Sequence, residues 1–274
     1  MAVESVTETA MIWGTVSGAS MLGMVISLLL SVSLPIFLGI FIYKKTKAWV
    51  PAFFIGCGIF VGFAMILEQI CHAIVLTVTG DVIRDNIWLY AIYGGLAAAL
   101  FEECGRWIAM KFCLKKHLTR ENALMYGAGH GGIEAFLILG MSSMSNLLTA
   151  AMINGGLMEK TMTALEPAQQ EVTYHQLSVL WTTPAYQFYL APVERISAIA
   201  LQIALSILVY SAVKTGRKLH LAAAFGLHFA VDFLTVICAA AIPTWALELG
   251  LLLVVAVICV VVYQLVYVQM AEKK

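Results

Sequence analysis

Residues 18–43 read GASMLGMVISLLLSVSLPIFLGIFIY, a stretch that contains no charged side chain. An α-helix needs about 20 mainly apolar residues to cross the hydrocarbon core of a bilayer, and this stretch is long enough. The rest of the chain shares this character, because 61% of the 274 residues are hydrophobic and 12% are charged. A soluble domain carries about 25% charged residues. The composition therefore excludes a water-soluble monomer and a disordered chain.

The balance of charge excludes a nucleic acid as partner. Sixteen Lys and Arg residues face 16 Asp and Glu residues, and the sequence contains no long basic block that could attract phosphates. The lipid bilayer is therefore the partner that the composition requires.

Apolar runs and the polar breaks between them predict seven transmembrane helices. We expect an all-α, polytopic helical bundle that forms a single integral-membrane domain over residues 1–274. The one long connection, residues 154–183, mixes acidic and apolar side chains, and we expect an external, partly amphipathic segment there. The expected spans are residues 18–43, 50–79, 87–113, 122–152, 184–213, 219–241 and 245–269.

The distribution of Lys and Arg predicts the orientation in the membrane. Twelve of the 16 fall at breaks on one side, and only Arg84 and Lys160 fall on the other. Cytoplasmic loops carry an excess of Lys and Arg, so we expect the N-terminus outside and the C-terminus in the cytoplasm of a multi-pass protein of the cell membrane. The twelve are Lys44, Lys45, Lys47, Lys111, Lys115, Lys116, Arg120, Lys214, Arg217, Lys218, Lys273 and Lys274.

Six acidic residues and three histidines fall well inside the expected spans, away from the polar breaks. A charged side chain at a helix centre costs about 2.5 to 3.5 kcal/mol on the insertion scale. Nine isolated polar groups would exceed what a marginally stable fold tolerates, so we expect them to converge on a polar interior. They are Glu68, Glu102, Glu103, Glu134, Glu194, Asp232, His72, His130 and His228.

Helix spacing brings Arg106 next to two of these acids. Arg106 follows Glu102 and Glu103 by about one helical turn. It can therefore hold one carboxylate ionised while the other faces a cavity. Arg106 and Arg195 are the cations that lie well inside the expected spans, away from the polar breaks.

Two histidines each have an acid four residues later, on the same helix face. These pairs are His130 with Glu134 and His228 with Asp232. At 1.5 Å of rise per residue, Glu102 and both histidines lie about 12 to 15 Å from the presumed cytoplasmic helix ends. Two such pairs in hydrophobic spans, beside a Glu-Glu pair, predict a shared catalytic or ligand site.

Four further polar residues come out about 27 to 33 Å from the cytoplasmic ends, toward the outer half of the membrane. They are Glu68, His72, Glu194 and Arg195, and they form either a structural layer of ion pairs or an outer contact for a substrate. The glycines of the stretch GAGHGG, residues 127–132, leave room around His130 for a neighbouring helix or for a substrate backbone.

A cavity with two histidines, several carboxylates and an arginine can activate water for attack on an amide. Imidazoles can bind a divalent metal such as zinc, which lowers the pKa of bound water, and a glutamate can take the proton. His130 and His228 can supply two ligands and Glu134 or Asp232 a third, which leaves one position open for water. Without a metal, a desolvated glutamate can act as the base while a histidine stabilises the oxyanion.

These residues resemble the YhfC family of intramembrane metalloproteases, related in motif to PrsW-type proteases and more distantly to the CAAX protease and bacteriocin-processing superfamily. The resemblance implies a multi-pass peptidase that acts on a membrane-embedded or membrane-associated protein or peptide. It implies that Glu102 or Glu103 activates water, that His130 and His228 bind metal or the oxyanion, and that Glu134 and Asp232 are ligands or orienting groups. The matching pieces are Glu102-Glu103-x-x-Arg106, Gly129-His130-Gly131-Gly132-x-Glu134-Ala135, Glu194-Arg195 and His228-x-x-x-Asp232.

Two other functions use the same kinds of residue. Intramembrane carboxylates and histidines also form proton relays and cation sites, so a proton- or cation-coupled transporter is an alternative. Many transporters are built from internal repeats, and this sequence shows none, which weakens that alternative. The second alternative is a non-catalytic scaffold that binds a transmembrane partner through the same cavity.

Overall fold

A computed structural model describes residues 11–270, and every regular element in that part of the chain is a helix. Seven helical runs are long and apolar enough to cross a membrane, which confirms the predicted all-α class and the number of spans. The runs are α1 (Gly18–Thr46), Pro51–Thr79, Ile87–Cys113, Arg120–Asn154, α10 (Ala185–Thr215), α11 (Lys218–Ala239) and Thr244–Tyr267.

Four of these runs change their helical form along their length. The second run consists of α2, a π-helical segment and α3, and the fourth of α6, a π-helical segment and α7. The third and seventh runs, which begin as α5 and α12, end in a π-helical turn. The bounds are α2 (Pro51–Phe60), η1 (Val61–Glu68), α3 (Gln69–Thr79), α5 (Ile87–Ile108), η2 (Ala109–Cys113), α6 (Arg120–Ala135), η4 (Phe136–Gly140), α7 (Met141–Asn154), α12 (Thr244–Val262) and η5 (Tyr263–Tyr267).

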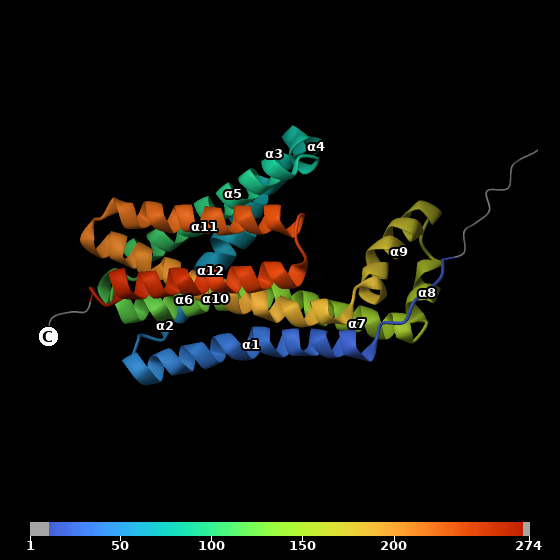
Figure 1. The fold of residues 1–274 in the computed structure, drawn as a ribbon, viewed down its shortest axis with the longest axis horizontal. Helices are drawn as coiled ribbons and strands as arrows, with labels where there is room; N and C mark the ends of the chain where they lie inside the picture. Colours follow the sequence, from blue (N-terminus) through green and yellow to red (C-terminus); the bar gives the residue numbers. More distant parts are fainter. Residues whose placement is uncertain (1–10, 271–274) are drawn as a thin grey trace, which may run out of the picture.

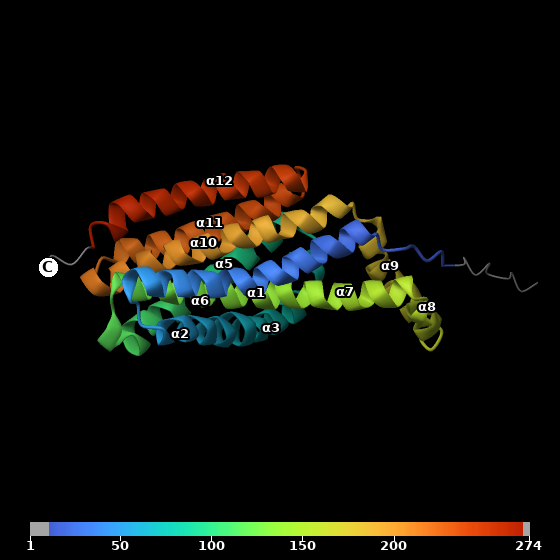
Figure 2. The same ribbon diagram turned by 90° about the horizontal axis from the view of Figure 1, so that it is seen from below.

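Several of the long helices, among them α1, α10, α11 and α12, run along the long axis of the molecule, and the run from α2 to α3 crosses it obliquely (Figures 1 and 2). The hydrophobic part of α10 is 72% buried, more than in any other described span. Both α6 and α12 pack against α10, α2 packs against α6, and α11 packs against α5. Because α10 also contacts α5 and α11, it brings together the helices that carry the predicted site, α5, α6, α10 and α11.

Two glycines let α6 approach its neighbours closely. A Cβ at Gly129 would overlap the carbonyl oxygen of Phe53 in α2. A Cβ at Gly127 would lie 2.7 Å from the Cα of Ile203 in α10, too close for real atoms. Backbone atoms of the two neighbours thus occupy the space beside the glycines, as expected for helix packing. Of the two interpretations of this stretch, the structure supports the neighbouring helix.

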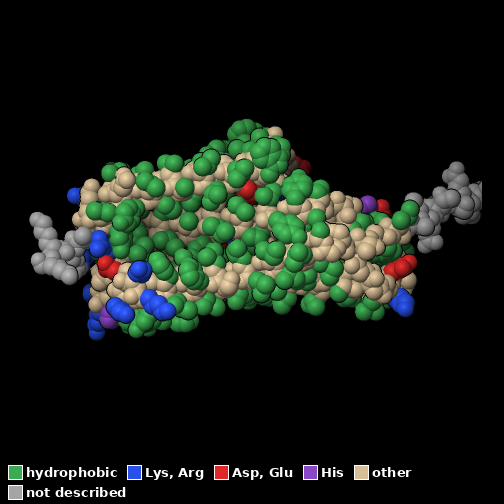
Figure 3. Space-filling model, turned by 60° about the horizontal axis from the view of Figure 1, so that its bottom comes forward, with side chains coloured by type: hydrophobic (Ala, Val, Ile, Leu, Met, Phe, Trp, Pro, Cys, Tyr) green, Lys and Arg blue, Asp and Glu red, His purple; other side chains and the backbone are tan. Residues whose placement is uncertain are grey.

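Lys and Arg side chains gather at one end of the molecule, and hydrophobic side chains cover much of its flank (Figure 3). This is the end where α1 finishes with Lys44 and Lys45 in its last turn. The other end carries residues 11–17 and the connection between the fourth and fifth spans (Figure 1). Lys273 and Lys274 lie outside the described residues. The orientation of the two ends across the membrane stays a prediction.

The long connection between the fourth and fifth spans is largely helical. It contains α8 (Leu157–Met162) and α9 (Pro167–Thr182), together with short turns. The segment before α1 packs on it, because the ring of Trp13 lies 5.8 Å from that of Trp181 and the Tyr174 hydroxyl donates to the carbonyl of Ile12 at 2.7 Å. Its predicted external position stays a prediction. The remaining short elements are α4 (Asp81–Arg84) and η3 (Lys115–His117).

Candidate functional site

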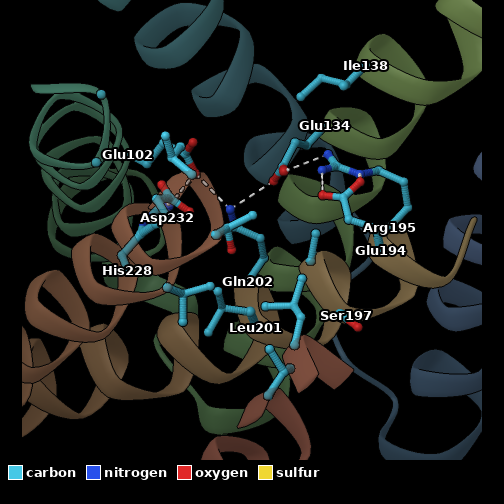
Figure 4. A pocket seen from close by; sticks show the side chains of 18 of the residues that line it. Glu102, Glu134, Ile138, Glu194, Arg195, Ser197, Leu201, Gln202, His228 and Asp232 are labelled. Carbon is cyan, nitrogen blue, oxygen red and sulfur yellow. Dashed lines mark hydrogen bonds and ion pairs between the residues drawn. The ribbon is translucent and has the colours of Figure 1, made fainter. Parts of the chain in front are cut away.

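A cavity of about 520 Å³ lies inside the bundle, between α3, α5, α6, α10, α11 and α12. Polar side chains from four helices point into it (Figure 4). They include Glu102 from α5, Glu134 from α6, Glu194, Arg195 and Gln202 from α10, and His228 and Asp232 from α11. Gln69 and His72 of α3 also line the cavity.

Glu102 lies at the centre of this group. Its Oε2 atom is 2.9 Å from Nε2 of His130 and 3.9 Å from Nε2 of His228. The same oxygen accepts a hydrogen bond of 2.9 Å from Nε2 of Gln202. Both predicted histidines therefore meet one carboxylate oxygen, although they come from different helices.

Glu103 contacts a different set of residues from its neighbour. Its Oε1 atom lies 3.1 Å from Nη1 of Arg106, an ion pair without the alignment of a hydrogen bond. The same Oε1 accepts a hydrogen bond of 2.8 Å from Nδ1 of His228. Glu103 is 2% exposed and Arg106 is fully buried. The structure thus places Arg106 on Glu103 and leaves Glu102 facing the cavity.

His130 is held from both sides of its ring. Nε2 lies against Glu102, and the hydroxyl of Tyr126 is 3.4 Å from Nδ1. Both His130 and Tyr126 are fully buried. A histidine that binds a metal through Nε2 carries its proton on Nδ1, and the Tyr126 oxygen is placed to accept that proton in a hydrogen bond.

Sequence reasoning missed Gln202, a buried residue of α10. Arg106 donates a hydrogen bond to its Oε1 atom. A guanidinium can only donate, so the amide oxygen must face Arg106 and the NH₂ group must face the carboxylates. Nε2 donates to Glu102 at 2.9 Å and to Glu134 at 2.8 Å, and so joins the two acids (Figure 4).

The four polar residues expected in an outer layer form two separate ion pairs. His72 lies 3.2 Å from Glu68, and Arg195 pairs with Glu194. Arg195 also reaches Glu134 at 3.2 Å, so the separation into an inner and an outer layer is wrong for this residue. A long arginine side chain covers the difference in depth between the two groups.

A subset of the cavity residues has the geometry of a metal site. One ligand atom each from Glu102, His130 and Glu134 lies within 4.8 Å of the others. One imidazole nitrogen and two carboxylate oxygens are a donor set that suits zinc and leaves a fourth position open. The residues therefore fit a divalent metal.

This set differs from the four ligands that we expected. Glu102 takes the place of His228 and Asp232 in this group. Nδ1 of His228 is bound to Glu103, and its Nε2 lies 3.5 Å from Asp232. Asp232 contacts His228 at the cavity wall, so these two residues lie beside the three-residue group rather than within it.

Comparison with known proteins covers all of these residues. A sequence model of the family described as YhfC intramembrane metalloprotease matches residues 30–259. The chain is 43% identical over 204 residues to a Bacillus subtilis (strain 168) protein described as uncharacterized membrane protein YhfC, an alignment that covers 71% of this chain and 76% of that protein. The chain matches no solved structure. On the strength of the family match and this identity, the chain is a membrane protein that belongs to the YhfC family.

Proposed function

We propose that this protein is an intramembrane metalloendopeptidase of the cytoplasmic membrane. It hydrolyses a peptide bond in a membrane-embedded or membrane-associated protein or peptide. The observation that carries the proposal is the meeting of Glu102, His130 and Glu134 in a cavity within the transmembrane bundle. The description of the family as intramembrane metalloproteases supports the same activity.

Glu102, His130 and Glu134 would hold the divalent metal, which would supply Lewis-acid activation of water and of the scissile carbonyl. Gln202 sets the spacing of the two carboxylates by donating to both, and Arg106 sets the orientation of Gln202. Removal of a contact of this kind around a metal site normally lowers the metal affinity or the activity by about 10- to 100-fold.

Glu102 is the carboxylate that takes the proton from the attacking water. It faces the cavity, whereas Glu103 is bound to Arg106 and His228. A carboxylate has two oxygens, so Glu102 could hold the proton while it also belongs to the group that would bind the metal. The proton is then available to the leaving amine, as general acid–base catalysis requires.

His228 stabilises the negative charge that develops on the carbonyl oxygen. Its ring is oriented by Glu103 through Nδ1, which leaves Nε2 beside the cavity, 3.9 Å from Glu102. A donor fixed in advance of the reaction is worth most in a site that excludes bulk water. Asp232, at 3.5 Å from Nε2, restricts the ring from the second side.

A cleavage assay tests this function. Purified protein is reconstituted in liposomes with a mixture of synthetic transmembrane peptides, and mass spectrometry detects the fragments. We expect cleavage by the wild type and by Glu121→Gln, which changes an acid near the basic end, and no cleavage by Glu102→Gln. Ion flux across the liposome membrane without any cleavage would assign the cavity to transport instead.

A further inference from the structure

A second hollow adjoins the cavity, between α11 and α12. We name it the lateral groove, and its volume is about 220 Å³. The two helices lie side by side at the edge of the bundle (Figures 1 and 2), and α12 packs chiefly against α10 rather than α11. Residues that define the groove include Leu234, Cys238, Ile242, Leu247, Gly250 and Val254.

The lateral groove is continuous with the catalytic cavity. Val231, Thr235 and Leu251 line both of them. Val231 directly precedes Asp232 in α11, so the groove begins beside the polar group of the cavity. A chain segment lying in the cavity can therefore place a side chain into the groove.

The lining of the groove is almost entirely apolar, and its edge is exposed on the surface that would face the lipid. Thr235 is the one hydroxyl-bearing residue among those that line it, and the others are apolar or carry a thiol. At its edge, Leu234, Ile242 and Val254 are 52%, 42% and 50% exposed. Leu234 and Val254 lie in candidate membrane spans, and Ile242 lies in the short turn that joins these two spans. An apolar group can thus enter the groove from the bilayer without leaving an apolar environment.

The volume of the groove indicates the size of its occupant. Sites for complete small molecules usually measure about 300 to 1,000 Å³, and the groove is smaller. It is large enough for one or two apolar side chains. Gly250 increases this room, because a Cβ at Gly250 would meet nothing within 4 Å.

We propose that the lateral groove binds a large apolar side chain of a transmembrane substrate segment, close to the bond that is cleaved. This inference rests on the proposed function. The segment enters between α11 and α12, its backbone reaches the polar groups of the cavity, and its side chain remains in the groove. Unpaired backbone groups are costly in hydrocarbon, so an unwound segment gains from donors and acceptors in the cavity. The groove holds the adjacent apolar side chain through shape and van der Waals contact.

Filling the groove tests the proposal. Gly250→Leu adds a side chain at a residue that lines the groove and whose Cβ would meet nothing within 4 Å. Gly58→Leu is the matched control, because Gly58 is also exposed, lies in a span and has nothing within 4 Å of a Cβ. The wild type and the control should cleave a mixture of transmembrane peptides with Leu, Ile, Met or Phe at one fixed position near the cut. In Gly250→Leu, cleavage of those peptides should fall at least about 10-fold relative to peptides with Ala or Gly there. An unchanged preference in Gly250→Leu overturns the proposal.

Photo-crosslinking tests the groove without relying on cleavage. The probe is a transmembrane peptide of about 20 residues that carries a diazirine analogue of leucine. It is added to Glu102→Gln protein in liposomes, with or without the substitution at Gly250 or Gly58. We expect crosslinks on α11 and α12 at groove residues, reduced about 10-fold by Gly250→Leu and unchanged by Gly58→Leu.

The two experiments separate the failure of each proposal. Crosslinks in the groove without cleavage by the wild type would contradict the proposed activity and leave the groove as a binding site for a transmembrane segment. Cleavage with crosslinks on other helices would contradict the groove and leave the activity. Labelling of the groove by a diazirine phospholipid that excess peptide does not reduce would assign the groove to lipid and overturn the proposal.

Discussion

The two adjacent glutamates should differ in what they do, and conservative substitutions separate them. Glu103→Gln keeps the volume of the side chain but leaves Arg106 without its counter-ion. At 3.1 Å and an effective dielectric constant of about 20, the lost attraction is about 5 kcal/mol. Removing one partner of a buried ion pair costs about 3 to 5 kcal/mol, in agreement with this figure. For a chain of this size, the melting temperature should fall by about 10 °C.

Glu102→Gln should abolish cleavage and leave the stability of the fold nearly unchanged. The glutamine retains an oxygen that accepts from His130, and removing one negative charge relieves repulsion with Glu134, which Gln202 holds nearby. We therefore expect the melting temperature to change by less than about 3 °C, the equivalent of about 1 kcal/mol. Loss of a general base slows a reaction by about 10²- to 10⁴-fold. Cleavage should thus disappear while the fold remains.

Thermal unfolding in detergent, followed by the near-ultraviolet circular dichroism of the aromatic side chains, measures stability. The cleavage rate of each variant is measured in liposomes at a temperature at which Glu103→Gln remains folded. Glu103→Gln should retain measurable cleavage there. Equal melting temperatures for the two variants, together with equal losses of cleavage, would refute the division between a catalytic and a structural carboxylate.

Three further predictions concern the metal, Gln202 and the topology. Purified wild type should contain about one divalent ion per chain by elemental analysis. His130→Ala should lose this ion, whereas His228→Ala should keep it and lose cleavage. Full activity of metal-free wild type would contradict the proposed role of the metal. Gln202→Leu should lower cleavage by about 10- to 100-fold in rate assays, and a wild-type rate would show that the contact between the two carboxylates is dispensable. In a cysteine-free background, a cysteine at Thr119 should be shielded from an impermeant thiol reagent in intact cells and one at Ala168 should react; labelling at Thr119 from outside would reverse the predicted orientation.

The spans were predictable because a bilayer forces backbone hydrogen bonds to close within each helix. The apolar runs are consequently long, and this fixes the position of each span to within a few residues. The ends depend on local chemistry: the fourth span was expected from residue 122, but it begins at Arg120 because the side chain of Thr119 accepts a hydrogen bond from the backbone of Asn122. The π-helical segments were not predictable, since no feature of the apolar pattern at Val61–Glu68 distinguishes them from α-helix.

The convergence of the acids and histidines was predictable from the free-energy cost of placing isolated charges in a membrane. Which side chain contacts which was not predictable. Hydropathy does not specify the rotation of a helix about its axis closely enough to say which of two adjacent residues faces the cavity. That rotation decides that Glu103 contacts Arg106 while Glu102 faces the cavity. Depth measured from the helix ends also failed for Arg195, because it locates backbone positions and ignores the reach of the side chain to Glu134.

Gln202 shows what a search for charged residues leaves out. An amide in the middle of an apolar helix is itself costly to bury without partners, and that cost was the available signal. Its partners explain why a cation lies among the acids. One guanidinium, that of Arg106, contacts Glu103, which orients His228, and also Gln202, which joins Glu102 to Glu134. The proposed donor set for a metal and the group proposed to stabilise the oxyanion therefore depend on the same side chain. A lysine could not make both contacts in this geometry, because a single ammonium lacks the planar fork that reaches two acceptors in fixed directions.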